Sequence, residues 1–102
     1  MRNSVEVMIK VHVRFLTRFK EVTKRDSADV SINKGSTIDD LLRHLCNLFG
    51  ESFCSLVFRR NGSIAENLVI FVNGKNILTL EGGKTKLADG DYLILSTPVV
   101  GG

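Results

Sequence analysis

The chain opens with a regular alternation of apolar and polar side chains. From Val5 to Phe15 every second residue is apolar, and charged or polar residues occupy most of the positions between. A period of two over this length predicts a half-buried β-strand. Residues 23–29 are expected to form a loop, and a short second strand should follow at Val30 and Ile32. The two strands would then pair as an antiparallel hairpin with a wide connection.

The clearest predicted element is a helix that begins near residue 36. Ser36 or Thr37 is the expected N-cap, because a hydroxyl can accept a hydrogen bond from a free backbone N–H. Asp39 and Asp40 lie in the first turn, where the helix dipole favours negative charge. Gly50 is expected to end the helix in the left-handed conformation. Apolar residues at helical spacing define one face: Ile38, Leu41, Leu42, Leu45, Leu48 and Phe49.

The pattern after this helix is less regular. The stretch "FCSLVF" within residues 51–67 fits either a strand or a further helical turn, and "RNGS" is typical of a turn. Residues 68–72 predict a strand, and Asn73-Gly74 predicts a tight hairpin turn. Residues 77–80 would then form the short return strand.

The end of the chain predicts one more strand. "LADGD" is typical of a turn, and we interpret Asp89 and Asp91 as turn residues rather than metal ligands. The last strand should cover residues 92–97 and end at Pro98, since proline cannot donate a hydrogen bond to a sheet.

The resulting order, β-β-α-β-β-β, predicts an α+β fold with a mixed sheet of four to five strands on one main helix. The first and last strands have the longest apolar runs, so we expect them to be central and parallel, with the C-terminus leaving the middle of the sheet. One domain over residues 1–97 and a flexible tail over residues 98–102 are predicted.

Composition adds few constraints. A chain of 102 residues without an apolar run of ~18 residues or a signal-peptide pattern predicts a soluble, cytoplasmic protein with no membrane partner. Cys46 and Cys54 match neither a metal site nor a disulfide framework, so we expect reduced, partly buried thiols.

Positive charge is concentrated in residues 10–25, where Glu21 is the sole acid among several lysines and arginines. Such a stretch indicates either a solvated surface or a docking surface for an acidic partner or RNA. We favour the solvated surface, and nucleic acid is not an expected partner.

The sequence contains no catalytic or metal-binding motif, which directs attention to its last residues. Pro98 stiffens the start of the tail, and Val99 and Val100 favour an extended backbone. Gly101 and Gly102 have no β-carbon, so another protein's active site can close tightly around them. An ionised carboxylate is a poor electrophile. An outside enzyme would have to activate the one at Gly102, and the pattern favours a carrier protein over an enzyme.

These features together resemble the small subunit of molybdopterin synthase and its sulfur-carrier relatives in the ubiquitin-like superfamily, which share the β-grasp fold. The resemblance rests on "MIKVHVRFLTRFKEV", "FVNGKNI" and "LADGDYLILSTPVVGG". The longer segment around "FCSLVFRRNGSIAEN" is more similar to the archaeal small modifier-type forms than to the thiamine-pathway carriers.

The resemblance implies a specific chemistry at Gly102. A ubiquitin-activating-type adenylyltransferase would use ATP to adenylate this residue, and the adenylate would become a thiocarboxylate. The molybdopterin synthase large subunit would then receive the tail, with residues Pro98 to Gly101 as its binding segment, for molybdenum cofactor biosynthesis. No cofactor or metal would be bound by the carrier itself.

Two alternatives remain open. The chain could instead be a ubiquitin-like modifier joined through Gly102 to lysines of target proteins, or a basic interaction module whose tail has no role. For the carrier and the modifier, we also expect a partner-facing surface on the uncovered side of the sheet.

Overall fold

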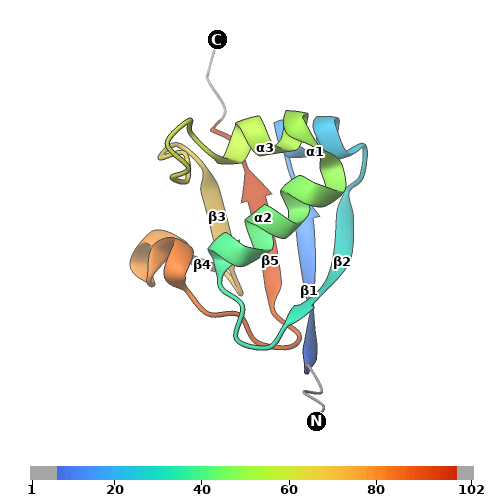
Figure 1. The fold of residues 1–102 in the computed structure, drawn as a ribbon, viewed down its shortest axis with the longest axis vertical. Coiled ribbons are helices and arrows are strands. Elements are labelled where there is room, and N and C mark those ends of the chain that lie inside the picture. Colours follow the sequence, from blue (N-terminus) through green and yellow to red (C-terminus); the bar gives the residue numbers. More distant parts are fainter. Residues whose placement is uncertain (1–6, 99–102) are drawn as a thin grey trace, which may run out of the picture.

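A computed structural model of the chain describes residues 7–98 (Figure 1). Its five strands form one mixed sheet in the order β2-β1-β5-β3-β4. None of the described helices has the length and apolar character needed to cross a membrane. The strands and helices in chain order are β1 (Met8–Phe15), α1 (Arg18–Thr23), β2 (Ser27–Asn33), α2 (Ile38–Phe49), α3 (Glu51–Val57), β3 (Val69–Val72), β4 (Lys75–Asn76) and β5 (Tyr92–Ser96).

The first and last strands lie side by side inside the sheet, as the sequence predicted. β1 and β5 are parallel, with Val13 opposite Leu93 and Phe15 opposite Leu95. On its other side β5 is antiparallel to β3, and β1 is antiparallel to β2. The end of the last strand therefore leaves the centre of the sheet.

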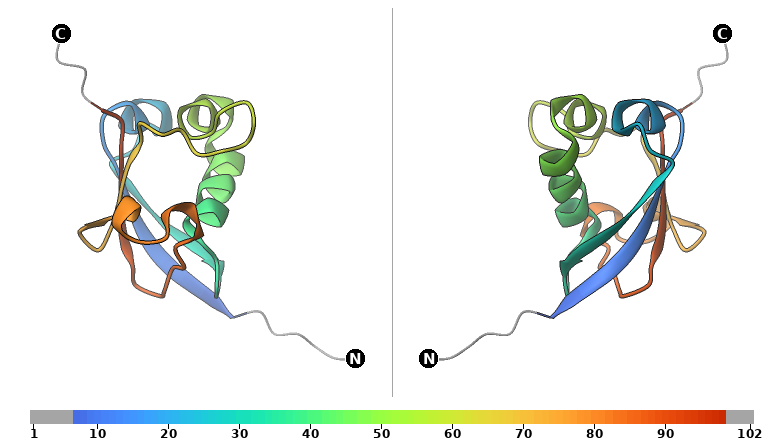
Figure 2. Two further views of the ribbon diagram at one scale, coloured as in Figure 1. Left: turned by 90° about the vertical axis from the view of Figure 1, so that its left-hand side faces the viewer. Right: turned by 90° about the vertical axis from the view of Figure 1, so that its right-hand side faces the viewer.

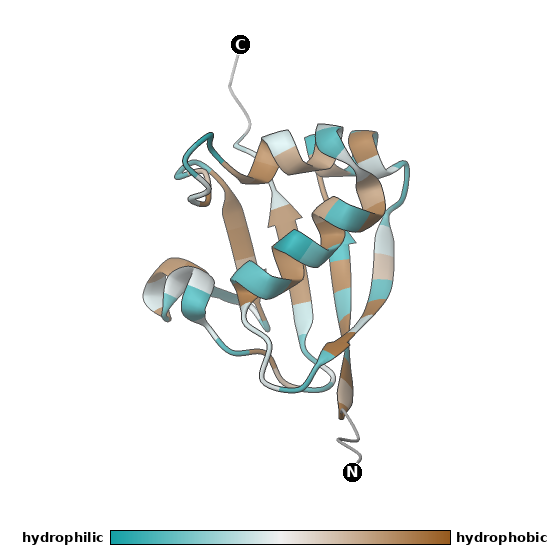
Figure 3. Ribbon diagram, viewed as in Figure 1, coloured by the Kyte–Doolittle hydropathy of each residue, from teal (hydrophilic) through white to brown (hydrophobic). Residues whose placement is uncertain are grey.

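The helices cover one face of the sheet and leave the other face open (Figure 2). In β1 the burial alternates, and Val11 and Val13 are completely buried beneath the helices. Leu41, Leu42 and Leu45 of α2 are equally buried, while the outer face of α2 is mainly hydrophilic (Figure 3). The apolar residues of β1 and those of α2 therefore pack together in a single core.

Helix α2 begins as predicted, at Thr37. The Thr37 hydroxyl accepts a hydrogen bond from the Asp40 amide at 3.2 Å, and the Asp40 carboxylate accepts one from the Thr37 amide at 2.9 Å. This reciprocal capping box satisfies two donors that the helix leaves free. Leu48, which its spacing placed on the apolar face of the helix, is 58% exposed and is not part of the core.

The predicted conformation of Gly50 was only partly right. Its φ is positive, at 88°, but its ψ of −168° is far from the left-handed helical value. The chain does not leave the helix layer here, because Gly50 directly precedes α3. Of the two structures that fitted "FCSLVF", the helix is correct, and it buries Phe53 and Val57 on one face.

Helix α1 and the length of β2 were not predicted. Residues 18–23 form a helix of six residues, in which Phe19 and Thr23 are buried. β2 starts at Ser27, so the predicted loop at 23–29 was wrong in its second half. A helix as short as α1 has too few turns to produce a helical period in the sequence. β2 is an edge strand, and its start can be polar because apolar alternation is not required there.

The hairpin after β3 was predicted correctly at its turn and wrongly in its return strand. Asn73 and Gly74 both have positive φ, at 51° and 85°, as a type I′ turn requires. The return strand has only two residues, and residues 77–79 form a 3-10 helix instead. The Asn76 side chain accepts a hydrogen bond from the Leu78 amide at 2.9 Å, which favours this helix over further pairing.

Four aromatic rings gather where α1, α2 and α3 meet β1. The Phe53 ring lies 5.3 Å from that of Phe19, 5.7 Å from that of Phe49 and 6.3 Å from that of Phe15, measured between centroids. We therefore expect Phe53→Ala to lower the free energy of unfolding by about 3–5 kcal/mol.

The matched control is Leu48→Ala, which removes an exposed side chain and should change stability by less than about 0.5 kcal/mol. Urea denaturation followed by circular dichroism measures both variants. An equal loss of unfolding free energy in the two variants would show that the aromatic cluster does not stabilise the packing of the helices.

Candidate functional site at the end of the last strand

The end of β5 lies at the same end of the sheet as α1 and α3 (Figure 1). Two backbone segments meet there. The Leu16 amide donates a hydrogen bond to the Leu95 carbonyl at 2.9 Å, which extends the parallel pairing past the end of β1. The chain therefore reaches Thr97 and Pro98 alongside the segment that leads into α1.

The hydroxyl group of Thr17 binds the chain at the point where it leaves β5. It accepts hydrogen bonds from the Thr97 amide and the Thr97 hydroxyl, each at 2.8 Å. Its own proton is donated to the Leu16 carbonyl at 2.7 Å, so the group uses its one donor and both acceptor positions. We call this arrangement the Thr17 clamp.

Thr17 adopts a backbone conformation that threonine rarely occupies. Its φ is 54° and its ψ is −129°, a combination strained for a β-branched residue by about 1–3 kcal/mol. The two hydrogen bonds that the Thr17 hydroxyl accepts from Thr97 offset part of this cost. Position 17 thus links the end of β1 to the base of the tail.

Of the predicted tail residues, only Pro98 lies within the described residues, and it is exposed directly after the clamp. Val99, Val100, Gly101 and Gly102 lie outside residues 7–98. The structure therefore shows where the predicted tail begins, and the roles of these four residues stay predictions.

The uncovered side of the sheet has an apolar strip, which consists of Phe71, Ile94 and Tyr92. Phe71 of β3 lies opposite Ile94 of β5, and both side chains are half-buried. Tyr92, two residues before Ile94, is 37% exposed. Its ring stacks on that of His12 with centroids 5.1 Å apart.

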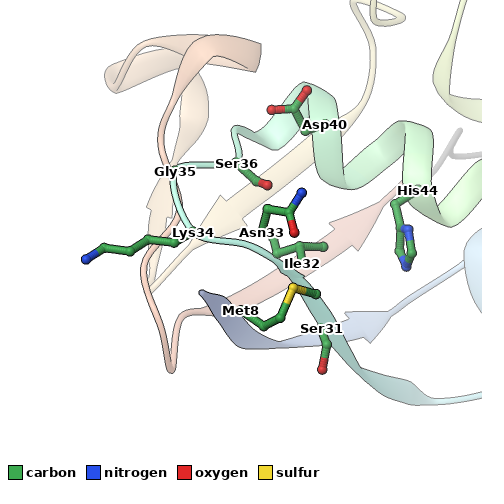
Figure 4. A pocket seen from close by; sticks show the side chains of 9 residues that line it. All are labelled: Met8, Ser31, Ile32, Asn33, Lys34, Gly35, Ser36, Asp40 and His44. Carbon is green, nitrogen blue, oxygen red and sulfur yellow. The ribbon is translucent and has the colours of Figure 1, made fainter. Parts of the chain in front are cut away.

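The two histidines have different surroundings. His12 Nδ1 lies 2.7 Å from an Asp29 carboxylate oxygen, and the His12 side chain is 41% exposed. His44 lines a hollow of about 600 Å³ between β2 and α2 (Figure 4). Its ring extends from α2 toward β2, at the end of the sheet opposite the tail. Within residues 7–98 no three histidine, cysteine or acidic side chains are placed to hold a metal ion.

Asp89 and Asp91 organise turns, as predicted. The Asp89 carboxylate accepts a hydrogen bond from the Lys10 amide at 2.8 Å, and the Asp91 carboxylate accepts one from the Ala88 amide at 2.8 Å. The Asp91 carboxylate also accepts a hydrogen bond from the side-chain amide of Asn73 at 2.9 Å. The "VNG" and "DGD" motifs therefore stabilise each other's loops.

Both cysteines are free and half-buried, as expected. Burial, together with neighbouring Cys54, raises the pKa of the Cys46 thiol to about 12. This thiol is protonated at neutral pH and is a weak nucleophile there.

The basic stretch includes surface ion pairs. Lys20 Nζ lies 2.9 Å from an Asp26 carboxylate oxygen. The hydrogen bond from Lys20 holds the pKa of Asp26 below its usual value. Both side chains are well exposed, and such a pair contributes little to stability.

The topology, the single main helix and the exit of β5 define a β-grasp protein of the ubiquitin-like class. Within this class the chain belongs to the ThiS family, whose profile matches residues 13–102.

Among its relatives, the chain is 28% identical to small archaeal modifier protein 3 of Haloferax volcanii over 94 residues, which is 92% of this chain and all of that protein. It is 30% identical to a putative sulfur carrier protein of Archaeoglobus fulgidus over 80 residues, 71% of this chain and 90% of that protein. The crystal structure of SAMP1 from Haloferax volcanii superimposes with a TM-score of 0.81 at 24% identity, covering 91% of this chain and 99% of that one. The similar proteins thus include one named as a modifier and one named as a putative sulfur carrier.

The Thr17 clamp makes a local prediction. Thr17→Ala removes the acceptor of both Thr97 hydrogen bonds and keeps the unfavourable φ, so the free energy of unfolding should fall by about 1–2 kcal/mol. Amide hydrogen exchange at Thr97 should become faster, because its N–H loses its partner.

Thr17→Ser keeps the hydroxyl and is the matched control, with Thr97 exchange close to that of the original protein. Thr17→Gly relieves the backbone strain without restoring the acceptor, so it should also expose the Thr97 amide. Unchanged Thr97 exchange in the alanine variant would contradict the clamp.

Proposed function

We propose that the chain is a sulfur carrier that works through a carboxylate at Gly102. The observation that supports this most directly is the family match, which extends through Gly101-Gly102. The fold supports it too, because the last strand ends at Ser96, the Thr17 clamp holds Thr97, and Pro98 after it is exposed. The clamp fixes the base of the tail and sets the place from which a partner receives it.

The chemistry requires an activating enzyme. A Gly102 carboxylate oxygen would attack the α-phosphorus of ATP in an adenylyltransferase of the ubiquitin-activating type, and pyrophosphate would leave. A sulfide donor would then attack the acyl carbon and displace AMP, which leaves a thiocarboxylate. This chain would contribute the acyl group and a recognisable body, and ATP would be bound by the enzyme.

We assign the thiocarboxylate to molybdopterin formation, with the molybdopterin synthase large subunit as the protein that receives the tail. The resemblance of "FVNGKNI" and "LADGDYLILSTPVVGG" to that synthase's small subunit supports this assignment. Pro98 to Gly101 would lie in the receiving channel. The apolar strip of Phe71, Ile94 and Tyr92 would contact the partner beside it.

The second candidate function is protein modification. It is supported by the similarity along 94 residues to small archaeal modifier protein 3. Here a lysine amine of the target would displace the activating group at Gly102, and an isopeptide bond would form. The same activated end serves both functions, so one protein can perform both.

Appending one alanine after Gly102 tests the shared step. The added residue moves the carboxylate away from the position that an activating enzyme has to reach, so adenylation and thiocarboxylate formation should be lost while thermal stability stays unchanged. Intact-protein mass spectrometry after incubation with the adenylyltransferase, ATP and a sulfide donor measures the replacement of one oxygen by sulfur. Adenylation of the extended chain would refute the mechanism.

The two functions separate in cells of the native host. A carrier gives the sulfur-exchanged mass, and deletion of Gly101-Gly102 abolishes molybdenum cofactor formation. A modifier gives larger adducts on denaturing, reducing gels, with the linkage at Gly102. Cofactor formation that survives deletion of the diglycine would remove the carrier assignment.

A further inference from the structure

A groove of about 630 Å³ opens on the helix side of the molecule, directly beside the base of the tail. Arg18 at the start of α1 lines it on one side, and Arg59 and Arg60 after α3 line it on the other. Thr97 and Pro98 also line the groove. We call this feature the arginine groove, and it lies on the opposite side of the sheet from the apolar strip.

The charges in the arginine groove are largely uncompensated. Among residues 7–98, neither Arg18 nor Arg60 has an ion-pair partner. Arg59 lies 3.6 Å from Glu66, but the two side chains are 50% and 87% exposed, so the pair is weak and easily exchanged. None of the residues that line the groove is acidic.

The groove also has an apolar component. Leu56, Phe58 and Leu68 line it and are half-buried against the core. Arginine combines a planar guanidinium, suited to paired hydrogen bonds with carboxylates, with weak hydration. A cationic rim above an apolar floor fits a peptide segment that carries acidic side chains and one apolar side chain.

The same residues do not form a nucleic-acid platform. Binding of single strands requires exposed aromatic faces on which bases stack. Phe58 is the aromatic ring in the groove, and the Arg43 guanidinium lies over it at 4.7 Å from its centroid.

We propose that the arginine groove binds an acidic segment of the activating enzyme, the adenylyltransferase that acts on the tail. This inference rests on the proposed function, since it gives that enzyme a second attachment point next to Pro98. Contact at the groove raises the effective concentration of the tail at the active site. Recognition would then be divided between the helix side of the carrier and the tail.

The first experiment compares charge-reversal variants in adenylation by the activating enzyme. Arg18→Glu with Arg60→Glu alters the groove, and Lys75→Glu with Lys86→Glu applies the same change in net charge at exposed positions elsewhere. The groove variant should raise the KM for the carrier at least about tenfold with kcat unchanged, given the strength of charge-assisted hydrogen bonds. The control should stay within about twofold, and both should melt near the original temperature.

Salt dependence gives a second readout. The KM of the original protein should rise with sodium chloride more steeply than that of the groove variant. Salt screens the charge contacts of the groove, and the variant has already lost these contacts. Equal KM values for groove and control variants, with the original protein still adenylated, would overturn the groove and leave the carrier function intact.

A binding experiment separates the groove from the carrier function itself. The probe is the peptide Asp-Glu-Leu-Glu-Asp, titrated into the full chain and followed by NMR at the arginine side-chain Nε–H groups. Shifts confined to Arg18, Arg59 and Arg60 support the proposal even if the chain is not adenylated. Shifts elsewhere would show that the groove is not a binding site. Tighter binding of an oligouridine strand would identify RNA as the ligand, and groove shifts that depend on protein concentration without peptide would identify a second copy of the chain. Each of these results would overturn the proposal.

Discussion

The parallel pairing of β1 with β5 is the constraint on which the rest of the structure depends. Because the two strands run in the same direction, the chain has to cross from one end of the sheet to the other between them, and the helices that make this crossing form the core's second layer. The pairing also places the end of β5 beside the end of β1. The residue that follows β1, Thr17, can therefore hold Thr97 although the two are far apart in the sequence.

This arrangement separates stability from chemistry. The buried side chains lie between the sheet and the helices, whereas the predicted reactive end leaves the molecule after the last strand. An apolar strip lies on the open side of the sheet, and the arginine groove lies on the helix side beside the base of the tail. The body therefore presents two chemically different surfaces.

Long, periodic segments were predictable and short ones were not. The alternation through Phe15 and the spacing from Ile38 to Leu45 each repeat often enough to define an element and its buried face. Helix α1 buries Phe19 and Thr23, and the 3-10 turn at Ile77 is capped by the Asn76 side chain. No sequence period reveals either feature. At the candidate site the sequence indicated Pro98 and the diglycine, but it did not indicate Thr17. A strained threonine is recognisable only when its backbone angles and its partner across the chain are known.

The direction of β1 has a practical consequence. Because β1 and β5 are parallel, Met8 and Ser96 lie at opposite poles of the body. A fluorescent or affinity domain fused ahead of Met8 would therefore begin at the pole opposite the end of β5. Immobilisation through such a domain would leave the Ser96 pole of the body facing solvent.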